Sequence, residues 1–144
     1  MIKKVIRILA LVFYILNLNC FVLANVDTKI LFKINNQIIT NIDLENEKKF
    51  LLFLNPNLNN LSDQQIKSIS QNSLTNRKIK EIELDKFFDL NDVNLGKEYI
   101  NNFIYNSNFQ NIDNFRNELD KVKLQFEYFE KNFLIDNVWR EYIL

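Results

Sequence analysis

Helix start signals recur along this chain from Thr40 onward. Five residues are expected to cap helices, and in four of these cases an apolar residue before the cap is matched by another five positions later. This spacing is typical of a hydrophobic staple, in which the two apolar side chains pack across the first helical turn. The repetition predicts a series of capped amphipathic helices. The expected caps are Thr40, Ser62, Asn91, Asn111 and Gln125, of which Asn111 lacks the preceding apolar residue and Gln125 is a poor capping residue.

Each start signal is followed by apolar residues at three- and four-residue spacing, as a helix with one buried face requires. Pro56 lies among asparagines and is expected to separate the first helix from the second, since proline cannot continue a helical hydrogen-bond ladder. The second helix is expected to run from about Asp63 to Phe88, and residues 106–110 are expected to join the third and fourth. The apolar face of the second helix is expected to hold Ile66, Ile69, Leu74, Ile79, Ile82, Leu84 and Phe87, and the ring side chains expected in the core are Phe103, Phe115, Phe129, Phe133 and Trp139.

A short β-hairpin is expected before the first helix. In the segment from Lys29 to Thr40, Ile30, Phe32 and Ile34 alternate with less apolar positions. The pair Asn35–Asn36 can adopt the positive φ angles that tight hairpin turns require. Because an isolated hairpin is marginally stable, it is expected to pack on the helices or to pair with another strand. The predicted fold is therefore mainly α: one amino-terminal hairpin followed by about five amphipathic helices in a single domain.

Residues 1–24 have the pattern of a secretory signal peptide. Three basic residues precede an apolar stretch, and Val22 and Ala24 occupy the −3 and −1 positions of a cleavage site. A membrane-spanning helix needs about 20 apolar residues, and two asparagines interrupt a shorter run here. An uncleaved anchor over residues 8–23 remains the alternative. Cys20 is expected to leave with the signal rather than to carry a lipid.

Composition excludes several kinds of chemistry from the mature chain, residues 25–144. It holds 15 basic against 18 acidic residues without a basic run, which disfavours nucleic acid as a partner. The chain has no histidine, and its one cysteine lies in the signal, so His general bases, Cys–His pairs and His or Cys zinc sites are excluded. The single glycine, Gly96, excludes a glycine-rich phosphate loop. We expect no cofactor, no metal and no small-molecule substrate.

Two acidic pairs, Glu81/Glu83 and Asp89/Asp92, remain as conceivable acid–base partners. We interpret the first pair as part of a solvated helix face and the second as part of a helix end. No catalytic residue is therefore predicted.

Three segments carry a family resemblance, in order along the chain. The first is ILFKINNQIITNIDLENE (30–47), an apolar strand, an Asn turn and an Ile-Ile-Thr-x-x-Asp-Leu arm. The second is the helix pair LNDVNLGKEYINNFIYNSNFQNIDNFRNEL (90–119), and the third is the helix FEYFEKNFLIDNVWREYI (126–143). Together they resemble the amino-terminal domain of the family of the periplasmic chaperone SurA and related parvulin-type prolyl isomerases. The resemblance spans nearly all of residues 25–144.

The resemblance implies a periplasmic chaperone module that binds unfolded or nascent outer-membrane polypeptides. In the family, isomerase activity belongs to separate parvulin domains that are rich in glycine and contain histidine, so we expect no isomerase catalysis from residues up to Leu144. One alternative is that the chain is the front piece of an isomerase whose catalytic domain follows Leu144. A second is a membrane-anchored interaction module, which would contact the membrane only through an uncleaved signal segment.

The family's amino-terminal domain is also completed by a helix and a strand from the far carboxy-terminus, which this sequence lacks as far as Leu144. The chain is then either a truncated or partial member of the family or a stand-alone relative that leaves open an apolar groove with a mildly acidic rim. Such a groove can hold alternating aromatic and aliphatic residues of a client without sequence-specific contacts. Aromatic candidates for its lining are Tyr99, Phe103, Tyr105, Phe109, Tyr128 and Tyr142, although none of them is assigned as a binding residue at this stage.

Overall fold

The computed structural model describes residues 27–144, and the predicted signal peptide (1–24) lies outside this range. The described chain is mainly helical, with a two-stranded antiparallel hairpin followed by five α-helices, which confirms the predicted fold class. The elements in chain order are β1 (Ile30–Ile34), β2 (Gln37–Thr40), α2 (Asn41–Leu54), the 3₁₀ helix η1 (Pro56–Asn60), α3 (Asp63–Leu84), α4 (Val93–Asn106), α5 (Ile112–Lys121) and α6 (Phe126–Tyr142).

The hairpin forms where the sequence predicts it. Asn35 adopts a φ of 51°, so the chain reverses through the left-handed conformation that asparagine tolerates. Ile34 pairs with Gln37 beside the turn, and the pairing shifts register between Ile30 and Phe32. Of the hairpin's apolar side chains only that of Ile39 is fully buried, and it anchors the hairpin to the helices.

Side-chain caps explain four of the five helix starts. The side chains of Thr40 and Ser62 each accept a hydrogen bond from the backbone N–H three residues later. The side chains of Asp43 and Gln65 in turn accept from the backbone N–H of the capping residue, which completes two capping boxes. Asn111 caps α5 in the same way through the N–H of Asn114. Gln125 precedes α6 without a capping hydrogen bond from its side chain, as expected of a poor capping residue.

Two predicted boundaries are wrong. The cap of α4 is Asp92 and not Asn91, because the Asp92 carboxylate accepts from Asn94 N–H while the N–H of Asn91 is bound to Asp89 Oδ1. Helix α3 ends at Leu84 and does not continue to Phe88. Residues 85–88 instead form a turn, in which backbone N–H groups donate to carbonyl groups three or four residues earlier. The chain then inserts Leu90 into an apolar cluster on α6, which requires it to leave the helix axis.

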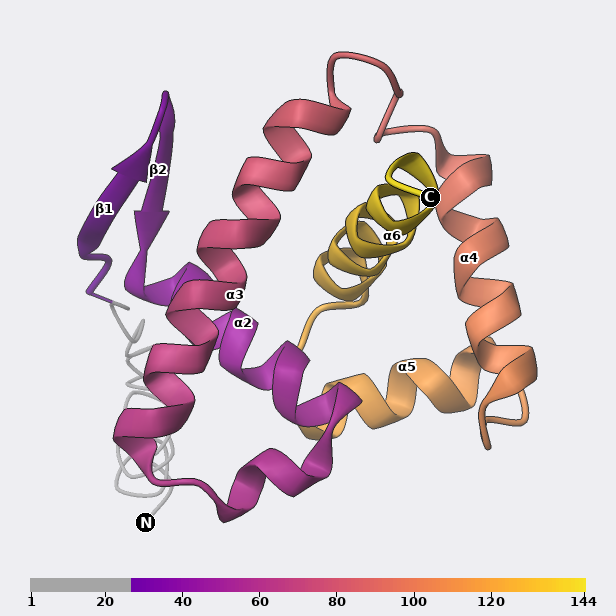
Figure 1. Ribbon diagram of the computed structural model, residues 1–144. Coiled ribbons are helices and arrows are strands. Elements are labelled where there is room, and N and C mark those ends of the chain that lie inside the picture. The colour runs from indigo at the N-terminus through magenta and orange to yellow at the C-terminus, as the bar shows by residue number, and fades with distance from the viewer. Residues whose placement is uncertain (1–26) are drawn as a thin grey trace, which may run out of the picture.

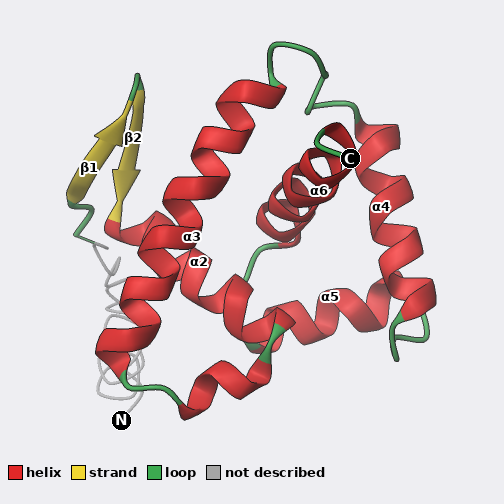
Figure 2. Cartoon of the chain, viewed as in Figure 1, coloured by secondary structure: helices red, strands yellow, loops and turns green. Residues whose placement is uncertain are grey.

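Helix α6 occupies the centre of the helical arrangement (Figure 1). It packs against α3 on one side and α4 on the other, while α2 packs on α3. Helix α5 crosses below α6 in this view and joins the α2 end of the molecule to the α4 end. The hairpin stands apart at the flank, next to α2 and α3 (Figure 2).

The core consists of two apolar clusters on α6. The larger contains the fully buried Phe50, Phe115 and Phe129, with Phe103 and Phe133 packed against them. The smaller joins Leu84 and Leu90 to the last turns of α6, with Trp139 packed against it. Of the ring side chains predicted for the core, Phe115 and Phe129 are fully buried, whereas Phe103, Phe133 and Trp139 are partly buried and pack against the clusters.

The buried face of α3 differs from the predicted one. Ile69, Ile79 and Phe87, which were expected to be buried, are exposed by 38%, 51% and 59%. The face that packs inward instead contains polar and charged side chains between apolar ones: Ile66, Ser70, Leu74, Arg77, Glu81 and Leu84. Neither this helix nor any other within residues 27–144 is long and apolar enough to cross a membrane.

Candidate functional site

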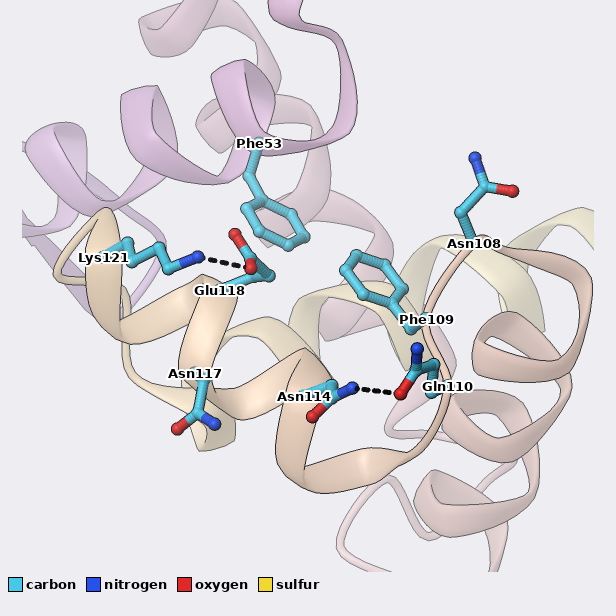
Figure 3. A pocket seen from close by; sticks show the side chains of 8 residues that line it. All are labelled: Phe53, Asn108, Phe109, Gln110, Asn114, Asn117, Glu118 and Lys121. Atoms are coloured by element: carbon cyan, nitrogen blue, oxygen red, sulfur yellow. Dashed lines mark hydrogen bonds and ion pairs between the residues drawn. The ribbon is translucent and has the colours of Figure 1, made fainter.

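An open cleft of about 750 Å³ lies between the end of α2 and the exposed side of α5. Figure 3 shows Phe53 entering it from α2 and Phe109 from the α4–α5 loop, with the two rings facing one another above α5. The ring planes are within 4° of parallel and their centroids are 6.2 Å apart. We call this the amide cleft; it is lined by Phe53, Asn108, Phe109, Gln110, Asn114, Asn117, Glu118 and Lys121.

The two rings are held by the core beneath them. Phe109 packs edge-on against Phe115 at 5.1 Å, and Phe53 contacts the same ring at 5.9 Å. Phe115 itself is fully buried. The apolar floor of the cleft therefore has a fixed position and does not depend on a ligand to organise it.

Carboxamides surround this floor. Asn114 donates a hydrogen bond to Gln110 Oε1 at 3.1 Å, and Glu118 pairs with Lys121 at the rim. The amides of Asn108 and Asn117 are exposed and make no side-chain hydrogen bond to any of residues 27–144. An asparagine amide offers N–H donors and an oxygen acceptor, and a peptide bond offers the complementary acceptor and donor. The cleft can therefore bind a peptide backbone and an apolar side chain together.

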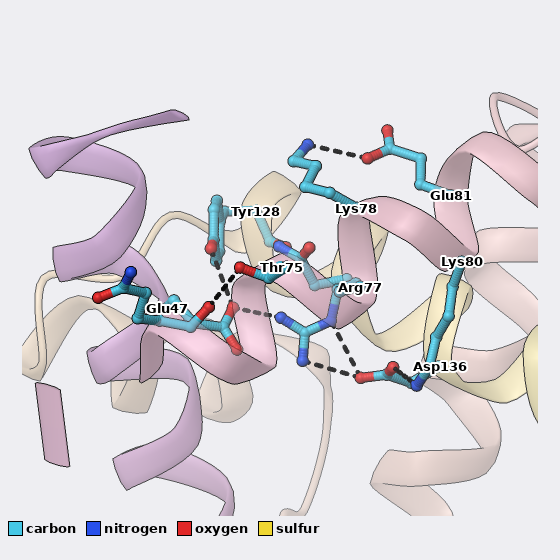
Figure 4. A network of polar contacts seen from close by, with 10 residues as sticks. Glu47, Thr75, Arg77, Lys78, Lys80, Glu81, Tyr128 and Asp136 are labelled. Atoms are coloured by element: carbon cyan, nitrogen blue, oxygen red, sulfur yellow. Dashed lines mark hydrogen bonds and ion pairs between the residues drawn. The ribbon is translucent and has the colours of Figure 1, made fainter. Parts of the chain in front are cut away.

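A second group of polar residues joins α2, α3 and α6, and none of them lines the amide cleft (Figure 4). Arg77 on α3 donates to Glu47 Oε2 on α2, and its Nε and Nη2 both donate to Asp136 Oδ2 on α6 at 3.0 and 2.9 Å. Lys80 also donates to Asp136, at 2.9 Å. Tyr128 on α6 donates to Glu47 at 3.2 Å. We call these five residues the buried ion network.

Burial governs the electrostatics of this network. Glu47 is fully buried and Arg77 is 4% exposed. Burial on its own lowers the pKa of Arg77, but the charges of Glu47 and Asp136 raise it on balance, so the guanidinium stays charged. Burial and the charge of Glu47 raise the pKa of Tyr128, so its hydroxyl keeps its proton and remains a donor. The network thus joins α2, α3 and α6 through the buried charges of Glu47 and Arg77 and the partly exposed charges of Lys80 and Asp136.

The sequence did not reveal the buried ion network, although one signal was present. Arg77 and Glu81 lie three and seven positions after Leu74, and Leu84 follows three positions later, so both charges occupy the spacing of the buried face. A charged residue in such a stripe indicates a buried ion pair. Glu81 does form two, with Lys78 at 2.8 Å and with Lys131 at 2.6 Å.

The acidic pairs considered from the sequence do not form a catalytic arrangement. Glu81 is 5% exposed, so it does not belong to the solvated helix face that was expected, whereas Glu83 pairs with Lys86 near the surface. Asp89 and Asp92 accept hydrogen bonds from nearby backbone N–H groups at the start of α4, as a helix-end role predicts. Within residues 27–144 no three His, Cys, Asp or Glu side chains come together as metal ligands.

The six aromatic residues considered for a groove do not line a single surface. Phe109 lies in the amide cleft, and Phe103 packs beside it on the core at 6.1 Å. Tyr128 belongs to the buried ion network, and Tyr105 is 88% exposed. Phe53, which completes the cleft, was not among them because it lies on α2, far from Phe109 in sequence.

Two tyrosines lie at the other end of the helices. Tyr99 donates to Glu141 at 2.7 Å, and burial together with this hydrogen bond raises the pKa of Tyr99 to about 12. Tyr142 stacks on Phe87 at 5.5 Å. Neither residue lines the amide cleft.

Neither the sequence nor the fold matches a known family model, a curated protein or a solved structure.

Proposed function

We propose that the chain is an exported module of chaperone type that binds extended segments of unfolded polypeptides in the amide cleft. The observation that carries this proposal is the combination of two fixed aromatic rings with uncommitted carboxamides in one open cleft of about 750 Å³. The rings accept an apolar side chain of any shape. The amides of Asn108 and Asn117 pair with backbone groups, which every polypeptide has.

The energies favour weak and reversible binding. Burying one large apolar side chain contributes roughly 1.5–3 kcal/mol, and a neutral hydrogen bond adds about 1 kcal/mol net. One cleft therefore retains a client segment only briefly. This suits a chaperone, since a client must be released to fold.

Three further expectations are part of the proposal. The signal-like residues 1–24 support export to the periplasm, and the three segments quoted above support kinship with the amino-terminal domain of the SurA family. The clients proposed on that basis are outer-membrane polypeptides, which alternate apolar and polar residues along each strand. Prolyl isomerase catalysis is not part of the proposal, because the chain has no histidine and one glycine.

The experiment measures how well the full chain, exported from a Gram-negative host and purified, suppresses aggregation of an unfolded β-barrel protein diluted from urea. Replacing Asn108 and Asn117 together by alanine removes two exposed amides that form no side-chain hydrogen bond with residues 27–144. At about 1 kcal/mol for each lost hydrogen bond, affinity for the client is expected to fall about tenfold or more. Light scattering gives the concentration needed for half-suppression.

A matched control replaces Asn72 and Asn102, which are also exposed and make no side-chain hydrogen bond to the described residues, on α3 and α4. The control is expected to suppress aggregation as well as the unmodified protein. If both double variants are equally active, or if the unmodified chain has no affinity for the client, the proposal is wrong. Catalysis of proline isomerisation in a peptide assay would instead support the isomerase alternative.

A further inference from the structure

A second cleft, of about 490 Å³, lies where α2, α3 and α6 meet. Leu51 and Leu54 from α2 and Trp139 from α6 form its apolar side. Arg77, Lys80 and Arg140 line it as well, with Asp136 as the only carboxylate in the lining. We call it the cationic cleft. No residue is shared with the lining of the amide cleft.

The charges of the cationic cleft do not cancel. Arg77 and Lys80 are balanced by Asp136 and by Glu47, which lies behind Arg77 in the interior. Arg140 is exposed and forms no ion pair with the residues that the structure describes. One positive charge is left over, although the mature chain as a whole is acidic.

Donors remain available beside this charge. Arg77 is 4% exposed and lies behind these donors, where its hydrogen bonds to Glu47 and Asp136 hold it in place. Lys80 has three N–H groups and directs one to Asp136. These donors are held in place by the buried ion network, so a carboxylate that enters meets an organised site.

We propose that the cationic cleft binds a carboxylate side chain next to an apolar one, in a peptide segment of the type apolar–acidic–apolar. The carboxylate pairs with Arg140 and accepts from Lys80, while the neighbouring apolar side chain packs on Trp139 and Leu54. A neutral apolar segment would leave the Arg140 charge unpaired, so the cleft discriminates by charge. This binding is independent of the amide cleft and does not rest on the function proposed for it.

Trp139 provides a local readout, because it is the only tryptophan in the chain and lines the cationic cleft. Its fluorescence is titrated in the full exported protein with acetyl-Leu-Glu-Phe-amide and with acetyl-Leu-Gln-Phe-amide. The two peptides differ by one charge and have nearly the same shape. A solvent-accessible ion pair contributes up to about 1 kcal/mol, so the Glu peptide is expected to bind about fivefold more tightly at low salt. About 1 M salt should remove the difference, because it shortens the screening length to about 3 Å.

The decisive variant is Arg140→Gln, which removes a charge without breaking an ion pair. In this variant the affinity for the Glu peptide is expected to fall to that for the Gln peptide, and the affinity for the Gln peptide is expected to stay the same. Arg116→Gln, an exposed arginine stacked on Phe126 in another part of the molecule, serves as the control and should retain the preference. Equal affinity of the two peptides for the unmodified protein, or an equal loss of both in Arg140→Gln, would overturn the proposal.

The two clefts can be tested separately. Replacing Asn108 and Asn117 by alanine should leave the Trp139 titration unchanged. A failure of the amide cleft would then appear only in the aggregation assay, and a failure of the cationic cleft only in the fluorescence titration.

Discussion

Replacing Arg77 by methionine tests the buried ion network most directly. Methionine keeps most of the side-chain length and can still pack on Phe50, over whose ring the guanidinium lies at 4.5 Å. The charge of Glu47, which is fully buried, then loses the one cationic partner that it has within residues 27–144 and retains a hydrogen bond from Tyr128. Asp136 keeps Lys80 and is partly exposed, so its loss is smaller.

The cost of this substitution follows from these environments. Removing one partner of a buried ion pair typically costs 3–5 kcal/mol, and we expect a loss of about 4 kcal/mol in the free energy of unfolding. A domain of this size has a total of roughly 5–15 kcal/mol. With a urea dependence of about 2 kcal/mol per molar, the midpoint of urea unfolding should fall by about 2 M. Circular dichroism during equilibrium urea unfolding measures this midpoint.

A second variant separates the charge from the packing. In Glu47→Leu combined with Arg77→Met, no charge is left unpaired in the interior, since Asp136 still has Lys80. We expect this double variant to recover most of the lost stability. A residual loss of about 1 kcal/mol is expected, because the Tyr128 hydroxyl no longer has Glu47 as its acceptor. As a control, Lys86→Met removes an exposed pair with Glu83 and should change stability by less than about 0.5 kcal/mol. The reasoning is refuted if Arg77→Met costs no more than Lys86→Met, or if the double variant costs the sum of its two single changes.

Two further predictions concern helix α6 and Glu81. Gln125→Ser should stabilise the protein by about 0.5–1 kcal/mol in urea unfolding, because it supplies the cap that α6 lacks; no gain would contradict this. Burial raises the pKa of Glu81, but hydrogen bonds from Lys131 and Lys78 lower it on balance. Stability from Glu81 is therefore complete above about pH 4.5 and is lost as the pH falls through the folded-state pKa. In Glu81→Gln the free energy of unfolding should fall less steeply as the pH is lowered. The same pH dependence in the variant and the unmodified protein would contradict this prediction.

Local signals predicted the parts of the fold that local chemistry determines. The turn at Asn35 and the caps Thr40 and Ser62 involve residues within three positions of one another, so their hydrogen bonds follow from neighbouring sequence. Asn91 and Asp92 are adjacent and both are good capping residues, and it is the Asp92 side chain that accepts from Asn94 N–H. Such competition is not decided by residue type alone.

Distant contacts determined what the sequence could not show. The inward face of α3 includes Arg77 because its partners, Glu47 and Asp136, lie on two other helices. Counting apolar residues therefore assigned exposed isoleucines to the core in place of this arginine. The amide cleft likewise depends on Phe53 meeting Phe109, and the cationic cleft on Leu54 meeting Trp139.

The last turns of α2 connect the two clefts. Phe53 lines the amide cleft, whereas Leu51 and Leu54, its neighbours in sequence, line the cationic cleft. Residues one and two apart project from different sides of a helix, which is about 10 Å across with its side chains. An extended chain advances about 3.3 Å for each residue, so a client segment of modest length can cross the end of α2 and enter both clefts. Short peptides then report each cleft alone, whereas an unfolded polypeptide gains from both through effective concentration.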